Sequence, residues 1–548
     1  MQIKIISSLE KCFLDEKIEN KKEISNASCF KNEIFHFGVC YCDEAQSFVR
    51  LTVNSPLKDY INVRRVAHVP VQKASEDTVC DDYYLRYNAG LYPDLLLPLG
   101  KFERLPVSRD LQSLFVDVAL DGMAEAGEYP IEFVFTNEDD EQKVFKVSFT
   151  LEVINASMPE QELKHTQWFH CDCLMDYYGV SAFSERHWKI IENFMKTAVK
   201  NGINMILTPV FTPPLDTYIG GERPTVQLVG VSKENGKYSF DFKLLDRWIE
   251  LCKKVGIKYF EISHLFTQWG AKCAPKIIAN INGEEKKIFG WETEALSKEY
   301  TEFLKAFLPE LIAYVKQKGI FERCYFHISD EPGEDCIEQY KKIKEIVEPL
   351  LDGRVIMDAL SHYEYYEQGI INHPVPVTCS VEKFAENNLP DLWTYYCCAP
   401  TNDYYSNRFI AMPSARNRII GTQMYKFDIK GFLHWGYNFY YNRSSYDCIN
   451  PYIYPDSDYF GSAGDSFLVY PAPDGTPYES IRIAVFYDAL QDIRALKLCE
   501  NLYGKDYVLK LIEEGIEPVT FNKYPRNDDY ILNLREKVNK AVKEALKE

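Results

Sequence analysis

Apolar and polar residues alternate along the first 155 residues of the chain. The segments Phe48–Val53 and Val144–Leu151 place apolar side chains at about every second position, which is the period of a half-buried β-strand. Turn residues such as Asp121-Gly122 separate these segments, and few stretches here have the helical period. Short strands joined by turns predict a β-sandwich domain over residues 1–155.

The pattern changes after the polar, proline-containing stretch 155–164. From there on, short apolar runs alternate with amphipathic helices, as they do in a parallel sheet that helices cover. The predicted strands are Thr166–Cys173, Ile203–Val210, Ile257–His264, Arg323–Ser329, Arg354–Ala359, Val375–Ser380, Leu392–Cys398 and Gly431–Tyr437. The predicted helices are Glu185–Lys200, Phe242–Val255, Lys298–Lys318, Cys336–Leu351, Ala415–Phe427 and Ser480–Leu502. This alternation predicts a (β/α)8 TIM-type barrel with C-terminal helices over residues 156–548, so the expected fold is multidomain, β plus α/β.

Composition and charge narrow the range of partners. The 548 residues carry 62 Lys and Arg against 81 Asp and Glu, a net charge of −19, and such a surface repels nucleic acid. No apolar stretch approaches the roughly 18–20 residues of a membrane span, and the N-terminus lacks the apolar core of a signal peptide. We therefore expect a cytoplasmic protein whose 16 cysteines are reduced thiols, without a membrane span or a nucleic-acid partner.

The cluster His170-Cys171-Asp172-Cys173 contains metal-ligating residue types. Its spacing matches no common zinc pattern, and small buried cysteines are frequent in ordinary cores. A phosphate-binding glycine loop and a nucleophile elbow are also missing from the chain. We expect no metal and no other cofactor.

In a barrel of this type the active site lies at the C-terminal ends of the strands and in the loops that follow them. These positions are rich in aromatic and polar side chains, which suits carbohydrate because sugars have apolar faces and hydroxyl edges. Packing in the barrel core is the alternative role for each aromatic and histidine. The segment 437–470 is too long for a simple connection, which favours a binding wall or lid. The candidate substrate-binding residues are Trp168, His170, Asp172, His264, Tyr395, Trp435, Tyr437, Arg443 and Asp465.

The adjacent carboxylates Asp330 and Glu331 stand at the end of the fourth predicted strand, directly before Pro332. Neighbouring residues of a strand point to opposite faces, so both can enter one pocket only if the strand breaks there, as a following proline favours. Helix capping is the alternative role, but Glu334 and Asp335 are better placed for it. Glycoside hydrolysis needs a carboxylic acid to protonate the leaving oxygen, so we take Asp330 and Glu331 as the candidate catalytic residues.

Two motifs carry a family resemblance. Phe326-His-Ile-Ser-Asp-Glu-Pro332, and Gly464-Asp-Ser-Phe-Leu-Val-Tyr-Pro471 followed by Ser480-Ile-Arg-Ile483, resemble motifs of the family 123 glycoside hydrolases over roughly the whole chain. The resemblance implies a β-sandwich before a catalytic (β/α)8 barrel. It also implies an exo-acting retaining β-N-acetylgalactosaminidase, in which the 2-acetamido group of the substrate is the nucleophile and an oxazolinium forms.

The resemblance implies a role for each carboxylate of the pair. Asp330 would accept the amide N–H and stabilise the oxazolinium charge, while Glu331 would protonate the leaving oxygen and then activate water. Tyr395 would hold the acetamido oxygen, and Trp435 would form the floor beneath the sugar. The expected substrate is an oligosaccharide or glycoconjugate with a terminal β-linked N-acetylgalactosamine.

Other interpretations of the sequence stay open. One is a glycosidase for another sugar that uses Asp330 or Glu331 with a partner such as Asp172 or Asp358. Another is a glycan-binding protein without catalysis. Selectivity for the galactose-type over the glucose-type sugar, the natural aglycone, the oligomeric state and the role of the sandwich also stay open.

Overall fold

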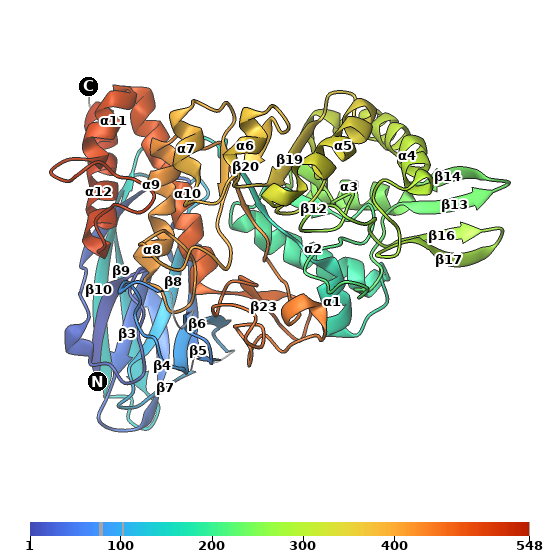
Figure 1. Cartoon of the computed structure of the whole chain (residues 1–548). Helices are drawn as coiled ribbons and strands as arrows, with labels where there is room; N and C mark the ends of the chain where they lie inside the picture. The colour runs from blue at the N-terminus through green and yellow to red at the C-terminus, as the bar shows by residue number, and fades with distance from the viewer. Residues whose placement is uncertain (76–79, 101–103, 547–548) are drawn as a thin grey trace.

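The computed structural model describes residues 1–75, 80–100 and 104–546. Figure 1 shows the N-terminal strands as one lobe, the barrel as a second lobe, and the last helices alongside the sandwich. The first sandwich sheet has the order β1-β3-β8-β5-β6 and the second β2-β10-β9-β4-β7. Their bounds are β1 Gln2–Ser7, β2 Asn26–Phe30, β3 Ile34–Cys42, β4 Ser47–Asn54, β5 Ile61–Val71, β6 Gly90–Pro98, β7 Arg104–Val107, β8 Gln112–Ala119, β9 Gly127–Asn137 and β10 Val144–Ile154.

The alternation in the sequence explains the core of the sandwich. In β4, Val49 and Leu51 are buried while Arg50 and Thr52 are exposed, so one face of the strand turns inward. Inward-facing residues of both sheets, such as Phe37 of β3, meet in a single apolar cluster. The predicted β-sandwich is confirmed.

The C-terminal part forms a nearly closed barrel of parallel strands in the order β20-β19-β18-β15-β12-β11-β22-β21. An isolated bridge between Val377 and Tyr395 joins the two ends of this series. The predicted barrel is therefore confirmed, and its strands read as apolar runs because they are buried on both faces. The bounds are β11 Lys164–Gln167, β12 Met205–Thr208, β15 Tyr259–Ile262, β18 Cys324–Phe326, β19 Val355–Ala359, β20 His373–Val375, β21 Trp393–Tyr395 and β22 Gly431–His434.

The predicted helices form close to their predicted positions, and further helices that were not predicted occur between and after them. Serine side chains cap several of them, as Ser184 does by accepting a hydrogen bond from His187 N, 3.3 Å away. The bounds are α1 Cys171–Tyr178, α2 Glu185–Lys200, α3 Lys243–Val255, α4 Lys298–Gln317, α5 Ile337–Val347, α6 Tyr363–Glu367, α7 Val381–Glu386, α8 Ser414–Arg418, α9 Ile420–Lys426, α10 Ile481–Tyr503, α11 Lys505–Ile512 and α12 Asp528–Ala545. Short 3₁₀ turns occupy Ile18–Asn20, Lys58–Tyr60, Phe321–Arg323, Glu334–Cys336, Glu348–Leu350 and Arg443–Ser445.

Three predictions at element level were wrong. The sixth barrel strand, predicted at Val375–Ser380, is β20 at His373–Val375 and shares only Val375 with the prediction. The first barrel strand ends at Gln167, and Cys171–Cys173 begin α1 instead of continuing the strand. The predicted helix Ala415–Phe427 is divided into α8 and α9. The long segments after the second and third barrel strands, for which no strands were predicted, form a small projecting sheet of β13 Gly230–Glu234, β14 Lys237–Asp241, β16 Ile277–Ile281 and β17 Glu284–Phe289 (Figure 1). A further hairpin consists of β23 Val469–Pro471 and β24 Pro477–Glu479.

Buried ion pairs fasten the sandwich to the barrel. Arg482 of α10 pairs with Asp94 of β6, 2.8 Å apart, and both side chains are almost fully buried. The same guanidinium donates to the carbonyl oxygens of Gly464 and Phe467, at 2.6 and 2.8 Å. Arg482 thus binds two backbone carbonyls of the second sequence motif and fixes the loop between Gly464 and Phe467 against the sandwich.

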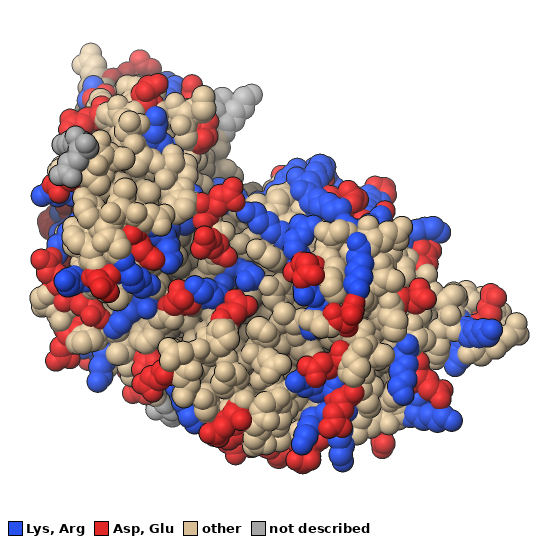
Figure 2. Space-filling model, turned by 90° about the horizontal axis from the view of Figure 1, so that it is seen from above, with Lys and Arg blue, Asp and Glu red and all other residues tan. Residues whose placement is uncertain are grey.

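The surface carries charge of both signs. Figure 2 shows acidic and basic side chains interspersed over one face of the molecule. Within the described residues, no helix combines the length and apolar character needed to cross a bilayer. The 16 cysteines all lie in the described ranges and are free thiols.

Candidate active site

A cavity of about 140 Å³ opens at the C-terminal ends of the barrel strands. This is the end at which barrels of this type place their chemistry. Larger hollows of about 230 and 420 Å³ lie between the sandwich and α12 and at the opposite end of the barrel, and neither contains the Asp330-Glu331 pair. The lining residues are Trp168, Asp216, Trp269, Asp330, Glu331, Ala359, Tyr395, Cys397, Cys398, Leu433, Trp435, Phe460, Gly461 and Asp465.

Asp330 and Glu331 enter the same cavity because the chain leaves its strand before them. Strand β18 ends at Phe326, and Glu331 adopts a positive φ of 41°, which is rare for a residue with a side chain. The bend is held at both residues: Trp269 N donates to Asp330 O at 2.8 Å, and Glu331 N donates to Ala359 O at 3.2 Å. Asp330 is half-buried, whereas Glu331 is exposed toward solvent. Backbone strain of this kind costs about 1–3 kcal/mol and concentrates at functional sites.

The carboxylates of the cavity perturb one another. Burial raises the pKa of Asp330 well above its ordinary value, and the nearby carboxylates of Glu331 and Asp216 raise it further. Burial also raises the pKa of Asp216 to about 6, with Arg223 acting against the shift and Glu331 adding to it. Asp330 and Asp216 therefore stay protonated to a higher pH than isolated carboxyl groups would.

Tyr395, the last residue of β21, reaches Glu331 across the cavity. Its hydroxyl donates a hydrogen bond of 2.5 Å to Oε1 of Glu331. Burial raises the pKa of Tyr395, and the Glu331 carboxylate adds to the shift, so the phenol keeps its proton for donation. The ring also packs in the barrel core, where it lies in one cluster with Trp393.

Trp168 is anchored beneath the cavity by a buried network of charges. Its indole N–H donates to Glu261 Oε1 at 2.7 Å, and the same oxygen lies 2.7 Å from His327 Nε2. The other ring nitrogen of His327 lies 3.1 Å from Asp358 Oδ1. These two carboxylates raise the pKa of His327 to about 9 despite its burial, so the ring is an imidazolium at neutral pH.

The network also holds the backbone directly before the acid pair. Asp358 accepts backbone N–H bonds from Ile328 at 3.0 Å and from Ser329 at 3.4 Å, the two residues directly before Asp330. The hydroxyl of Tyr340 donates to its second oxygen at 2.6 Å. Glu261, a charged residue inside the apolar run of β15, is a sequence signal for this network that was not among the predicted site residues.

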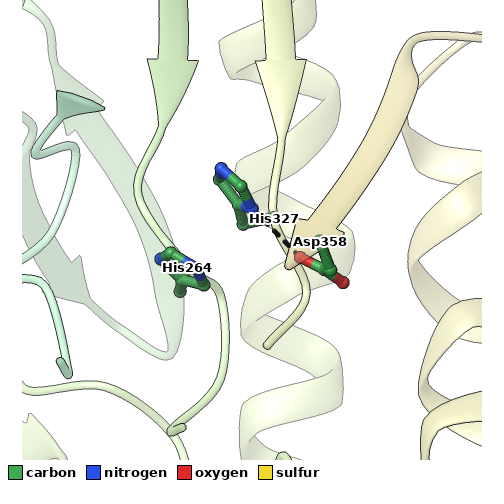
Figure 3. Close-up of side chains that lie close together, drawn as sticks. All are labelled: His264, His327 and Asp358. Carbon is green, nitrogen blue, oxygen red and sulfur yellow. Dashed lines mark hydrogen bonds and ion pairs between the residues drawn. The ribbon is translucent and has the colours of Figure 1, made fainter. Parts of the chain in front are cut away.

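His264 lies against this network and outside the cavity lining. Figure 3 shows His264, His327 and Asp358 at the ends of three neighbouring strands. The rings of His264 and His327 stack with centroids 4.2 Å apart, and within the described residues neither nitrogen of His264 has a hydrogen-bond partner. Ligand atoms of these three residues lie close enough together to face one ion. In this structure, however, both nitrogens of His327 already contact carboxylate oxygens, those of Glu261 and Asp358.

The exposed group Glu334, His362 and Glu364 also brings ligand atoms together. It lies on the surface around α6, where His362 pairs with Glu334 at 3.2 Å. Exposed acidic groups of this kind are ordinary solvated surface, so the group gives no support for a metal site.

His170 and Asp172 lie beside the cavity and bind Arg223. Asp172 forms a bidentate pair with the guanidinium at 2.6 and 2.8 Å, and both side chains are almost completely buried. His170 accepts from Arg223 at Nδ1, 3.1 Å away, and donates from Nε2 to the carbonyl of Trp435 at 2.7 Å. Burial and the arginine charge lower the pKa of His170 to about 3, so the ring is neutral.

Trp435 and Asp465 share one wall of the cavity. The indole N–H of Trp435 donates to Oδ2 of Asp465 at 3.1 Å. Oδ1 of Asp465 lies 3.2 Å from Nε2 of His434 without the alignment of a hydrogen bond, and it has no other hydrogen-bond partner among the described residues. Burial raises the pKa of Asp465 to about 7, against the opposing charge of Arg408.

Two candidate residues lie away from the cavity lining. Tyr437 is fully buried and donates to Phe194 O at 2.9 Å, which ties the eighth strand to α2. Arg443 is exposed on the 3₁₀ turn Arg443–Ser445. This turn still reaches the site, since the hydroxyl of Ser445 donates to Asp216 O at 2.7 Å.

The cavity also contains residues that the sequence did not single out. Asp216 lies in the long segment after the second strand, and Phe460 lies in the loop after the eighth. Trp269 stands shortly after the third strand, where an aromatic residue was a recognisable signal. Loop residues of this kind carry no periodicity that would place them in a cavity.

Comparison with known proteins settles the family. Residues 168–499, more than half of the chain, match the model of the glycoside hydrolase 123 catalytic domain. The chain belongs to glycoside hydrolase family 123. The family 123 match spans the barrel from the anchored Trp168 to α10 and includes both sequence motifs.

One solved structure has the same fold over the whole chain. A family 123 glycoside hydrolase from Clostridium perfringens, studied for glycolipid glycan hydrolysis, matches with a TM-score of 0.75 at 17% identity, over 100% of this chain and 98% of that one. A GH5 xyloglucanase from Bacteroides ovatus overlaps with a TM-score of 0.33 at 8% identity, over 85% and 98% of the two chains. A family 39 glycoside hydrolase from Bacteroides cellulosilyticus gives 0.33 at 11% identity, over 86% and 81%. No curated protein sequence matches the chain significantly.

Proposed function

We propose that this family 123 hydrolase is an exo-acting retaining enzyme that releases terminal β-linked N-acetylgalactosamine by substrate-assisted catalysis. The observation that carries the proposal is the strained bend that turns two consecutive carboxylates, Asp330 and Glu331, into one cavity. The cavity is small and lined by aromatic rings, which suits a single terminal sugar better than the interior of a long chain.

In the proposed mechanism the nucleophile belongs to the substrate. The oxygen of the 2-acetamido group attacks the anomeric carbon, the glycosidic bond breaks, and an oxazolinium forms. Asp330 accepts the amide N–H and stabilises the positive charge, while Glu331 gives its proton to the leaving oxygen and later takes one from water. No second carboxylate is needed as a nucleophile, because substrate-assisted enzymes depart from the usual two-carboxylate layout.

The contacts of the rival carboxylates favour this mechanism. Asp172 is fully engaged by Arg223, and Asp358 is engaged by His327, Tyr340 and two backbone N–H groups. Neither carboxylate lines the cavity, so neither is available as the nucleophile of a two-carboxylate mechanism.

Tyr395 serves two steps in this proposal. In the free enzyme its hydroxyl orients Glu331 through the 2.5 Å hydrogen bond. Once Glu331 carries the proton that it will donate, its oxygen accepts less strongly, and the phenol can turn to the acetamido oxygen of the bound sugar. The raised pKa of Tyr395 keeps the donor protonated throughout.

The remaining candidates divide into sugar contacts and supports. Trp435 and Trp168 provide apolar faces, and the carboxylate of Asp465, which lines the same wall, is the candidate acceptor for a hydroxyl group of the sugar. His170, Asp172 and His264 act one layer behind, where they fix Trp435 and the Trp168 network. Tyr437 holds the eighth strand in place, and Arg443 belongs to the turn that supports Asp216.

Glycolipid glycans are the first natural substrates to test, because the Clostridium perfringens relative was studied for their hydrolysis. The proposal is tested with aryl β-glycosides and the purified enzyme. We expect turnover of the N-acetylgalactosaminide with retained anomeric configuration and inhibition by a thiazoline mimic of the oxazolinium. Efficient turnover of the β-galactoside, which lacks the acetamido group, would contradict the mechanism. The matching N-acetylglucosaminide measures selectivity at C4.

A further inference from the structure

Three large aromatic side chains remain exposed beside the cavity. Trp269, which also lines the cavity, is 55% exposed, and Tyr446 and Tyr218 are 64% and 39% exposed. These three residues are called the aromatic shelf below. Contiguous exposed apolar surface marks binding sites, whereas single exposed apolar side chains are ordinary.

The shelf is built from three loops that hydrogen bonds hold together. The rings of Tyr218 and Tyr446 stack with centroids 4.4 Å apart and planes within 12°. The backbone joins the same two loops, because Tyr218 N donates to Ser444 O at 3.1 Å. Gln268, next to Trp269, accepts from Asp216 N and donates to Thr217 O at 3.2 Å. The loops after the second, third and eighth strands are therefore held in one arrangement.

Backbone strain accompanies this arrangement. Asp216, Trp269, Ser444 and Ser445 have φ values of 48°, 54°, 59° and 55°, in the region that residues with side chains seldom adopt. Such strain persists only where the surroundings enforce it, and it concentrates at ligand clamps and active sites. The shelf is thus a preformed surface and not a loose loop tip, which lowers the entropic cost of binding.

The position of the shelf beside the acid pair indicates which part of the substrate it would contact. Trp269 N holds the carbonyl of Asp330, so the tryptophan sits at the bend of the acid pair. Glu331, the proposed general acid, is the exposed member of that pair, and the leaving group departs past it. The inner wall of Trp435, Tyr395 and Asp465 is already assigned to the terminal sugar. The exposed side therefore faces the leaving group.

We propose that Trp269, Tyr218 and Tyr446 form a binding subsite for the sugar units on the leaving-group side of the cleaved bond. This inference rests on the proposed function, because it takes Glu331 as the general acid. Flat aromatic faces with polar edges match carbohydrate rings, whose C–H faces are apolar and whose rims are hydroxylated. The nearby carboxylate of Asp216 adds an acceptor for hydroxyl groups at the border of the two subsites.

The test compares two substrates with the same terminal sugar and similar leaving-group chemistry. One is methyl β-N-acetylgalactosaminide, which has no leaving-group sugar, and the other is an oligosaccharide with the same terminal unit. We expect Tyr446→Ala and Trp269→Ala to lower the ratio of kcat/KM for the oligosaccharide to that for the methyl glycoside by about tenfold. Trp269→Phe, which keeps a flat face, should recover part of the ratio. Tyr507→Ala on α11, 37% exposed and remote from the cavity, is the matched control.

The outcomes separate the two proposals. If the wild-type enzyme cleaves neither substrate, the proposed function fails before the shelf is tested. If it cleaves both and the ratio is unchanged in Tyr446→Ala and Trp269→Ala, the shelf does not bind the leaving group. A loss seen only with a glycolipid in vesicles, and not with the free oligosaccharide, would show that the surface contacts lipid and would overturn the carbohydrate assignment.

Discussion

The hydroxyl of Tyr395 donates a 2.5 Å hydrogen bond to Oε1 of Glu331, although the two residues stand 64 positions apart in the chain. Tyr395 ends β21, and Glu331 lies in the bend beyond β18, so only the closed barrel brings them together. The contact gives the proposed general acid a fixed orientation in an otherwise exposed position.

Tyr395→Phe removes this hydrogen bond and keeps the ring that packs in the barrel core. We expect kcat to fall by about tenfold to a hundredfold, because a misplaced general acid transfers its proton less efficiently. The deficit should be larger for an alkyl leaving group than for an activated aryl group, and steady-state kinetics on both glycosides measures it. Equal losses on both substrates would assign the tyrosine to the acetamido group alone.

Glu331→Gln removes the proposed acid and base while preserving side-chain shape. We expect turnover of substrates with poor leaving groups to fall by about 10²–10⁴-fold, the usual contribution of general acid–base catalysis. An aryl glycoside with a very acidic leaving group should lose much less in the first step. Exposed Glu334→Gln, in the next turn of the chain, is the matched control. Near-normal hydrolysis of alkyl glycosides by Glu331→Gln would remove this residue from the mechanism.

Asp330→Asn should abolish activity and stabilise the fold at the same time. The raised pKa of Asp330 means that the folded protein binds its proton more tightly than the unfolded chain does. Wild-type stability is therefore lost as the pH rises from the ordinary carboxyl range through the raised pKa, whereas asparagine stays neutral. We expect the free energy of unfolding of Asp330→Asn to exceed that of the wild type by about 1 kcal/mol at neutral pH, and this difference should disappear near pH 4.

Thermal unfolding of both proteins at pH 4 and pH 8 tests this expectation. Asp139→Asn, in an exposed turn of the sandwich, should show no such pH-dependent gain. A variant that is less stable than the wild type at pH 8 would mean that the Asp330 charge is favourably paired in the fold.

The pH dependence of kcat/KM follows from the same carboxyl group. Asp330 must be ionised to accept the amide N–H, so activity should fall as the pH drops below its raised pKa. The acidic limb should therefore lie above the ordinary carboxyl range of about 3.9–4.3. A pH–rate profile measures the midpoint. A midpoint within that ordinary range would show that Asp330 is not the group that controls the limb.

The sequence predicts the barrel well for a physical reason. Strands buried on both faces appear as apolar runs, and turn and cap residues such as Ser184 and Gly256 mark helix ends. The Asp330-Glu331 pair is visible because it follows such a run and precedes a proline. Local patterns of this kind depend on residues that are close in the chain.

The rest of the site depends on contacts between distant segments. Cys171-Asp172-Cys173 alternate like a strand, but they fold as helix α1, where Asp172 meets Arg223 from a segment 51 positions away. Asp216 and Phe460 reach the cavity from long loops without periodicity. Nothing near His327 in sequence reveals that it lies between Glu261 and Asp358.

His327 should contribute stability that depends on pH. Its pKa is raised to about 9 in the fold, against about 6.5 in an unfolded chain, because Glu261 and Asp358 stabilise the imidazolium. The contribution is complete below about pH 6.5 and is lost as the pH rises through about 9. Urea unfolding of the wild type across this range should show the decrease in the free energy of unfolding. Trp168, which shares Glu261 with His327, should be held less firmly at the higher pH.

His327→Gln leaves two buried carboxylates without their cation, so we expect a loss of about 3–5 kcal/mol at pH 6.5 that narrows toward pH 9. His68→Gln, at a half-buried histidine of the sandwich, is the matched control. Because burial lowers the pKa of His68, its effect on the free energy of unfolding should not change between pH 6.5 and pH 9. The KM of the variant for the aryl glycoside should rise, because Trp168 and the bend before Asp330 lose their common anchor. Wild-type stability that stays constant from pH 6.5 to 9 would exclude a charged His327, and the network would then be a neutral hydrogen-bonded one.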